Sequence, residues 1–259
     1  MFSGTMREVK IVHISDVHVK SAYYSEELAS NVIDYISNLE PDVLVITGDL
    51  TDNGYPHEYD DAVDFVNQLK ARVKVVVPGN HDARNMGYVL FEELFKTRFP
   101  MVDLGWLKIQ GVDSSEPDLD DGHIGRLAYG LVEESLIGFK GIKIVALHHH
   151  LVPIPGTGRE RNIPVDSGDF LALLCKVGVH LILSGHKHVP WIWELNSMLI
   201  VNAGTATTLR VKAHNPPSFN IITLNTEGEV VIERVESETL KSTQIYKGIV
   251  KGAKIVSLG

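Results

Sequence analysis

The sequence has one cysteine, Cys175, and no apolar run approaching the ~20 residues that a bilayer-spanning helix needs. A single cysteine excludes an internal disulfide and is typical of proteins in a reducing compartment. Cys175 lies in the apolar stretch DFLALLCKVG, so we expect a buried structural thiol on a helix. The first ten residues lack the apolar segment of a signal peptide. We therefore expect a cytoplasmic protein with no membrane partner.

Basic residues are also few. The 24 lysines and arginines are outnumbered by 33 aspartates and glutamates, which gives a net charge of −9. Proteins that coat nucleic acid need a basic face, so extended nucleic acid is not an expected partner. A small basic pocket for one phosphate group remains compatible with this balance.

Apolar residues make up 44% of the 259 positions, which is enough for a large core. Chains of this length often form one α/β domain. We expect a single domain over residues 1–259, with its core at about 7–236. The pattern of residues 237–259 is too weak to predict a structure.

The first eighty residues alternate between strand-like and helix-like apolar patterns. Strands are predicted at 9–14, 42–46 and 73–77, and helices at 25–40 and 57–70. This order predicts right-handed crossovers and a parallel sheet that is covered on both faces.

The rest of the chain predicts more strand than helix. Strands are expected at 104–112, 142–147, 180–183, 198–201, 219–224 and 230–235, and helices at 87–96, 126–137 and 169–177. Residues 225–228 form a turn that joins the last two strands into a hairpin. The predicted fold class is α/β, with two sheets packed face to face and helices outside.

Five polar clusters follow the ends of predicted strands. They are Asp16-x-His18, Gly48-Asp49, Gly79-Asn80-His81-Asp82, His148-His149-His150 and Gly185-His186-x-His188. Since neighbouring parallel strands place their carboxyl ends at one sheet edge, the first three clusters are expected to meet. Carboxylates and imidazoles suit manganese, iron and zinc. A single catalytic zinc takes about three protein ligands, so this larger set predicts two adjacent ions.

The residue types predict how the ions are shared. Asp16 and His18 can converge on one ion, and the two oxygens of Asp49 can bridge both. Asn80 offers a neutral oxygen, which limits negative charge where an anionic substrate must enter. Glycines 48, 79 and 185 are expected to allow tight turns beside the ligands.

The clusters resemble those of the calcineurin-like metallophosphoesterase family, which reads D-x-H, G-D, G-N-H-D/E, a histidine after a strand, and G-H-x-H. The likeness runs from Asp16 to His188. The stretches GDLTDNG, LHHHLVP and SGHKHVP most resemble the branch that contains class III cyclic-nucleotide phosphodiesterases. The resemblance implies a four-layer αββα sandwich of two mixed β-sheets flanked by helices.

The resemblance also divides the ligands between two manganese, iron or zinc ions. One ion would be held by Asp16, His18, Asp49 and His188, and the other by Asp49, Asn80, His148 and His186. Relatives often read H-H-P-P where this chain has three histidines. Aligning the first of the three selects His148 as the ligand, leaves His149 beside the site, and makes His150 an outward loop residue.

The family pattern implies in-line attack on phosphorus by hydroxide held between the metals, without a phosphoenzyme. His81 would act near the leaving group, with Asp82 as its partner, and both are candidate catalytic residues. Arg84, Tyr88, His149, Arg159 and Arg161 are candidates for contacting the substrate.

The expected function is hydrolysis of a small phosphodiester, with a cyclic nucleotide as one option. Alternatives with the same site are a phosphomonoesterase, a protein phosphatase, a nuclease or a nucleotide pyrophosphatase. A different class is a non-catalytic protein-binding scaffold, since the family includes a retromer subunit. That class predicts eroded ligands, whereas every candidate ligand and His81 are present here. Related phosphodiesterases can dimerise, so a homodimer is a possible partner state of this chain.

Overall fold

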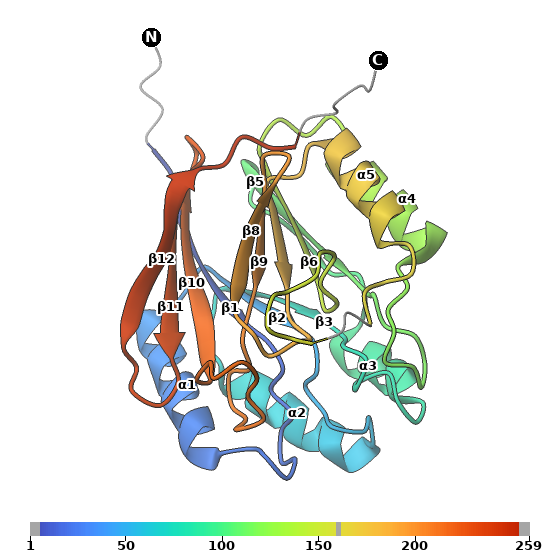
Figure 1. Cartoon of the computed structure of the whole chain (residues 1–259), viewed down its shortest axis with the longest axis vertical. Coiled ribbons are helices and arrows are strands. Elements are labelled where there is room, and N and C mark those ends of the chain that lie inside the picture. The colour runs from blue at the N-terminus through green and yellow to red at the C-terminus, as the bar shows by residue number, and fades with distance from the viewer. Residues whose placement is uncertain (1–5, 159–161, 254–259) are drawn as a thin grey trace.

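Two six-stranded sheets pack face to face in the computed structural model, which describes residues 6–158 and 162–253 (Figure 1). The first sheet has the order β12-β11-β10-β1-β2-β3, and the second has the order β4-β5-β6-β7-β9-β8. The strands are β1 Glu8–Ile14, β2 Val43–Thr47, β3 Val73–Val77, β4 Met101–Asp103, β5 Leu107–Val112, β6 Ile142–Leu147, β7 Leu181–Ser184, β8 Trp191–Leu195, β9 Met198–Asn202, β10 Ser218–Asn225, β11 Glu229–Glu236 and β12 Ser242–Ile249.

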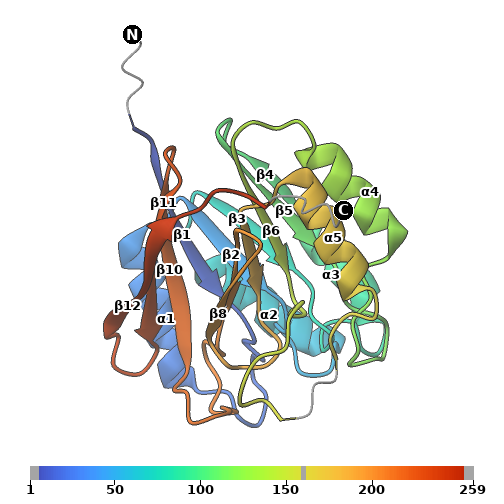
Figure 2. The same cartoon turned by 45° about the horizontal axis from the view of Figure 1, so that its top comes forward.

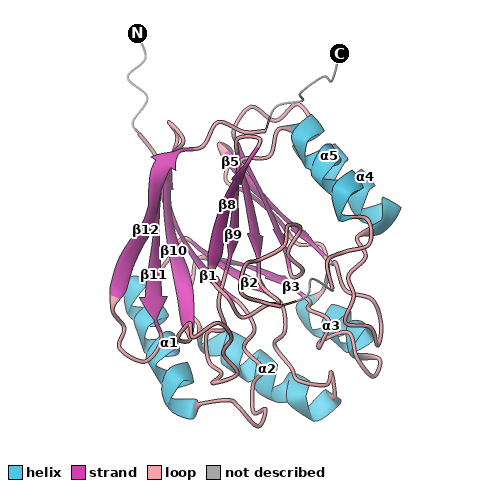
Figure 3. Cartoon of the chain, viewed as in Figure 1, coloured by secondary structure: helices cyan, strands magenta, loops and turns pink. Residues whose placement is uncertain are grey.

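Helices cover the outer face of each sheet (Figure 3). They are α1 Glu26–Leu39, α2 Pro56–Gln68, α3 Gly87–Phe95, α4 Gly125–Leu136 and α5 Ser167–Val177. Apolar residues of α1, α2 and α3 share a core with the first sheet, and those of α4 and α5 share one with the second. A third core lies between the two sheets. The predicted αββα sandwich of two mixed sheets is confirmed.

The alternation of β1 shows how the layers arise. Ile11 faces the core between the sheets, whereas Val12 faces the core under α1 and α2. Successive strand residues point to opposite faces, and here both faces are buried, which explains the continuous apolar run. Burial of each such side chain contributes ~1.5–3 kcal/mol.

Strand direction places the polar clusters at one end of the sandwich. β1, β2 and β3 are mutually parallel, as are β5, β6, β7 and β9. β10 pairs with β1 in the antiparallel direction, so the first sheet is mixed. The view in Figure 2 shows the two sheets in their facing arrangement. Loops that follow the carboxyl ends of β1, β2, β3, β6 and β7 carry the five clusters.

Several elements differ from the sequence prediction. The strand predicted at 104–112 begins only at Leu107, because Gly105, with a φ of +82°, lies in a turn that joins β5 to the unpredicted strand β4. β8 and β12 were not predicted, because both are edge strands with mostly exposed or half-buried residues and so lack a clear apolar period. Cys175 on α5 is half-buried rather than buried, and its sulfur accepts a hydrogen bond from Asn196. Among the described residues, no helix is long and apolar enough to cross a membrane.

Candidate metal centre

Hydrogen bonds donated by four backbone amides tie four of the five strand-end loops together. The amide of Asp16 donates to Gly48 O at 3.0 Å, and the amide of His18 donates to Asp49 O at 2.9 Å. The amide of Gly185 donates to His148 O at 2.9 Å, which joins the last two clusters. The amide of His186 donates to Asp16 Oδ2 at 3.0 Å and thereby links the two sheets. The candidate ligands are therefore held by a connected backbone rather than by independent loops.

Five of the seven candidate ligands have backbone in the left-handed region. Non-glycine residues reach it at a cost of ~1–3 kcal/mol, and they do so most often at functional sites. The residues are Asp16 (φ 53°), His18 (φ 45°), Asp49 (φ 53°), His186 (φ 74°) and His188 (φ 56°). This clustering of strained backbone indicates that ligand placement, rather than local stability, determines these loops.

Glycines allow the loops to approach closely. Of the three glycines in the clusters, only Gly48 has a positive φ, at +82°. Gly79 and Gly185 are required for a different reason: a Cβ on Gly79 would lie 2.1 Å from Asp49 Oδ1, and one on Gly185 would lie 1.8 Å from Ser15 Oγ. The expectation of tight turns therefore holds for Gly48, whereas the other two make room for neighbouring loops.

Substitution of Gly79 provides a test of this packing. Gly79→Ala is expected to displace the Asp49 carboxylate and to weaken metal binding by at least ~10-fold, a loss typical when groups around a metal site are disturbed. Titration of the metal-free protein with Mn²⁺ by calorimetry measures the change. Gly130→Ala is the control, because a Cβ there meets no atom within 4 Å and α4 tolerates alanine. Equal Mn²⁺ affinity in both variants would contradict the packing argument.

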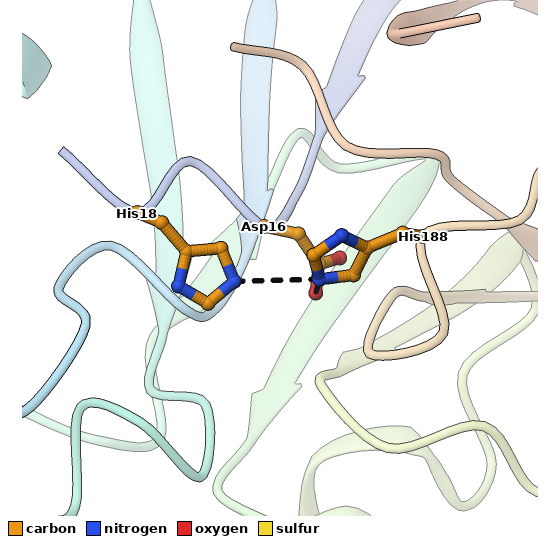
Figure 4. Close-up of side chains that lie close together, drawn as sticks. All are labelled: Asp16, His18 and His188. Carbon is orange, nitrogen blue, oxygen red and sulfur yellow. Dashed lines mark hydrogen bonds and ion pairs between the residues drawn. The ribbon is translucent and has the colours of Figure 1, made fainter. Parts of the chain in front are cut away.

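The first group of donor atoms comes from Asp16, His18 and His188 (Figure 4). His188 Nε2 lies 3.3 Å from His18 Nε2 and 3.2 Å from Asp16 Oδ1. His188 Nδ1 donates to Arg210 O at 2.7 Å, so Nε2 presents its lone pair to the other two residues. The carbonyl thus orients the imidazole in the way that groups behind metal ligands do.

The second group comes from Asp49, His148 and His186, with Asn80 among them. Asn80 Oδ1 lies 3.0 Å from both His148 Nε2 and His186 Nδ1, and these two nitrogens are 3.1 Å apart. His148 Nδ1 donates to Thr47 O at 2.7 Å, which leaves Nε2 facing the group. The side-chain amide nitrogen of Asn80 donates to Asp120 Oδ1 at 3.0 Å, which orients the Asn80 side-chain oxygen towards the group.

Asp49 lies between the two groups. Its Oδ2 is 3.6 Å from His18 Nε2 in the first and 3.4 Å from His148 Nε2 in the second. Its Oδ1 accepts the amide hydrogen of His81 at 3.0 Å, which fixes the carboxylate. One carboxylate oxygen therefore faces imidazoles of both groups.

The donor atoms fit metal ions. Ligand atoms that share one ion at ~2.0–2.2 Å lie about 3 Å from each other, which is the separation seen within both groups. Asp16 Oδ1 and His18 Nδ1 are buried and form no hydrogen bond within the described chain, although His188 Nε2 lies 3.2 Å from the first and Asp52 Oδ1 lies 3.4 Å from the second. An unsatisfied buried carboxylate oxygen is costly, and a cation at this position would satisfy it.

The electrostatics of the buried carboxylates point in the same direction. Burial alone would raise the pKa of Asp49, but the neighbouring His148 and His81 hold it well below its ordinary value. Burial would lower the pKa of His148, yet Asp49 raises it to about 9. The site therefore keeps its carboxylates ionised and attracts positive charge.

The three consecutive histidines have different environments. Only His148 directs a nitrogen at Asp49 and Asn80. His149 is buried behind the site, where its Nδ1 lies 2.9 Å from Ser114 Oγ and its Nε2 lies 3.2 Å from Asp120 O. The prediction for His150 was wrong, because it is 1% exposed and stacks on the His186 ring. All three side chains are therefore buried.

His81 takes Asp52, not Asp82, as its neighbour. His81 Nδ1 donates to Asp52 O at 2.6 Å and lies 3.6 Å from Asp52 Oδ1. The expected Asp82–His81 pairing is not formed: the Asp82 carboxylate is buried and accepts hydrogen bonds from the amides of Leu50, Thr51 and Gly79. Asp82 therefore joins two ligand loops, and burial raises its pKa to about 6.

The candidate substrate residues have different placements. Arg84 lines a cavity of about 150 Å³ beside the donor groups and pairs with Asp120 at 2.6 Å. Tyr88 on α3 and His149 do not line this cavity. Arg159 and Arg161 lie outside the described residues.

Sequence reasoning missed five charged residues at this site. Asp52 lies next to His18 and His81. The other four line the cavity and are Asp120, Lys187, Arg210 and Lys212. Asp52 could have been found within GDLTDNG, since it lies only three residues after Asp49. Lys187 stands inside the G-H-x-H cluster. The other three lie in loops whose paths depend on tertiary contacts.

The fold and these donor groups define the class of the protein, a metallophosphoesterase fold with groups able to bind divalent ions at its strand ends. The model of the calcineurin-like phosphoesterase family matches residues 9–190. The chain belongs to this family and is a metal-dependent phosphoesterase.

Curated relatives carry phosphodiesterase names. A cAMP/cGMP dual-specificity phosphodiesterase of Mycobacterium tuberculosis is 32% identical over 199 residues, which cover 69% of this chain and 61% of the relative. A probable glycerophosphodiester phosphodiesterase of Arcobacter nitrofigilis is 30% identical, with coverage of 75% and 77%. A probable cyclic nucleotide phosphodiesterase of Vesicomyosocius okutanii is 25% identical, with coverage of 86% and 96%.

Solved structures share the fold at low identity. A purple acid phosphatase from yellow lupin superposes with a TM-score of 0.69 at 16% identity, and the match covers 92% of this chain but 53% of the phosphatase. The Plasmodium inner-membrane-complex anchor GAP50 gives a TM-score of 0.67 at 14% identity, with coverage of 95% and 90%. At these identities the likeness concerns the fold alone.

Proposed function

We propose that the protein hydrolyses a small phosphodiester with two metal ions bound side by side. The observation that carries the proposal is the position of Asp49 Oδ2 between His18 and His148, with a separate set of donors on each side. Asp16, His18 and His188 would complete the coordination of one ion. Asn80, His148 and His186 would complete that of the other. Manganese, iron and zinc all accept this mixture of oxygen and nitrogen ligands.

When bound, two such ions supply charge neutralisation for the phosphoryl oxygens and an activated water. The chain contributes the other requirements. Its buried, backbone-linked loops hold the ligands rigidly, and Arg84 at the cavity edge is placed to pair with a phosphoryl oxygen. Arg84 is itself oriented by Asp120.

His81 is the residue placed to move a proton. Its Nδ1 donates to Asp52 O, so Nε2 is the nitrogen that can carry a second proton towards the cavity. Asp52 Oδ1 lies 3.6 Å from Nδ1, and Arg84 Nη1 lies 3.0 Å from the same nitrogen. We propose that Nε2 gives this proton to the departing alkoxide of the ester.

The substrate is small, and the named relatives support a diester. The cavity of about 150 Å³ is below the roughly 300–1,000 Å³ of pockets that enclose a whole ligand. It therefore holds the reacting group and little else. Cyclic nucleotides and glycerophosphodiesters, which the names of the relatives mention, are the first substrates to assay.

Metal-loaded protein should hydrolyse bis(p-nitrophenyl) phosphate faster than p-nitrophenyl phosphate. The assay compares protein reconstituted with Mn²⁺, Zn²⁺ or Fe²⁺, and extends to 3′,5′- and 2′,3′-cyclic nucleotides. Chelation should abolish turnover, and added Mn²⁺ should restore it. Inactivity on every ester, with bound metal verified by mass spectrometry, would contradict the proposal and favour a protein-binding scaffold.

A further inference from the structure

Four basic side chains line the cavity beside the donor groups. They belong to Arg84, Lys187, Arg210 and Lys212. In a chain with a net charge of −9, such a concentration is unlike the overall composition. Two carboxylates, Asp49 and Asp120, line the same cavity, so the basic side chains outnumber the acidic ones. An excess of one sign of charge in a cleft attracts an oppositely charged ligand.

Two of these residues adjoin the donor groups through the chain or the backbone. Lys187 stands between His186 and His188, and only 6% of its surface is exposed. Arg210 accepts the hydrogen bond of His188 through its carbonyl.

The loop that carries Arg210 and Lys212 is tied to the first cluster. Thr205 Oγ1 donates to Asp16 O and Thr207 Oγ1 donates to Val17 O, both at 2.7 Å. The backbone of this loop is therefore joined to the loop that carries Asp16, and the exposed side chains of Arg210 and Lys212 lie at the edge of the cavity.

The cations differ in how their charge is balanced. Arg84 forms an ion pair with Asp120. Arg210 and Lys212 form no ion pair within residues 6–158 and 162–253, although the Arg210 charge helps to lower the pKa of Asp52. Burial lowers the pKa of Lys212, the nearby Lys187 and Arg210 cations lower it further, and the Asp16 and Asp49 carboxylates act in the opposite direction. Like charges held this close repel each other, and an anion between them would relieve the repulsion.

We propose that Arg210 and Lys212 form a second anion subsite, which selects phosphodiesters that carry another phosphate or carboxylate close to the scissile phosphate. This inference rests on the proposed function for the identity of the first phosphate. A diester phosphate has one negative charge, which the two ions and Arg84 already balance. Two further cations exceed what a singly charged diester needs, and none of the described residues that line the cavity has an apolar side chain to hold a nucleobase.

A matched pair of ligands separates the second anion from the first. Propylphosphonate and 3-phosphonopropionate have similar lengths, but the latter ends in a carboxylate. Calorimetric titration of the metal-loaded protein should give a Kd about 10-fold lower for 3-phosphonopropionate, as expected for one charge-assisted contact. Arg210→Gln and Lys212→Gln should remove this difference and leave the Kd of propylphosphonate within about 2-fold. Lys247→Gln, on the exposed edge strand β12, is the control.

Three results would overturn the subsite: equal Kd values for the two ligands in the wild type, an unchanged preference in both variants, or equal weakening of both ligands. The last would mean that the cations hold only the first phosphate. Ester hydrolysis is measured on the same samples. A protein that prefers the dianion yet hydrolyses no ester would support the subsite while contradicting the proposed function.

Discussion

Replacement of Asp49 by alanine is expected to remove both metal ions and to lower phosphodiester turnover by about 1,000-fold or more. The Asp49 carboxylate faces both donor groups, so its loss takes a ligand from each ion at once. Two bound ions stabilise the transition state by several kcal/mol, and each ~1.4 kcal/mol corresponds to a factor of ten in rate. Metal content by mass spectrometry and turnover of bis(p-nitrophenyl) phosphate are measured on the same protein.

A second substitution of Asp49 distinguishes loss of metal from misfolding. Asp49→Asn keeps an oxygen that can accept the amide hydrogen of His81, and should fold while still losing at least one ion. Asp64→Ala, which removes an exposed carboxylate on α2, should change neither metal content nor rate. Two bound ions with full activity in both Asp49 variants would exclude Asp49 as the bridge.

Replacement of His81 by alanine should leave both ions bound and reduce turnover by ~100- to 10,000-fold, the usual contribution of a positioned general acid. His81 contributes no donor atom to the group around Asn80. It lies at the rim of the cavity, where 12% of its side chain is exposed. Its loss should therefore affect chemistry more than metal affinity. Turnover and metal content again form the paired readout, with His57→Ala on the exposed start of α2 as the control.

The leaving group distinguishes an acid from a residue that merely supports the site. A nitrophenolate departs without a proton, whereas an alkoxide requires one. The loss in His81→Ala should therefore be much smaller for a nitrophenyl ester than for an alkyl ester or a 3′,5′-cyclic nucleotide. Equal losses for both classes of ester would rule out proton donation by His81.

The sequence predicted the fold and the meeting of the clusters because both follow from local patterns. Apolar runs of five to seven residues that alternate with amphipathic helices define parallel strands, and parallel strands bring their carboxyl ends together. This reasoning required no knowledge of side-chain contacts. It located Asp16, Asp49 and Asn80 at one edge, where the structure also places them.

Residues outside that pattern were not predictable. Arg210 and Lys212 reach the cavity because Thr205 and Thr207 bond to a loop about 190 positions earlier, and no local signal encodes such a contact. The partner of His81 was misassigned because adjacency in sequence suggested Asp82, whereas the backbone turns the Asp82 side chain towards Leu50 and Thr51. Local motifs thus predicted donor types, and tertiary contacts determined their neighbours.

The number of metal ions at full activity tests the central claim most directly. Metal-free protein is titrated with Mn²⁺ while bound metal and phosphodiesterase rate are followed together. We predict that the protein binds two ions per chain and that the rate reaches its maximum only as the second ion binds. A maximal rate at one ion per chain, or saturation with a single ion, would contradict a site in which Asp49 joins two metals.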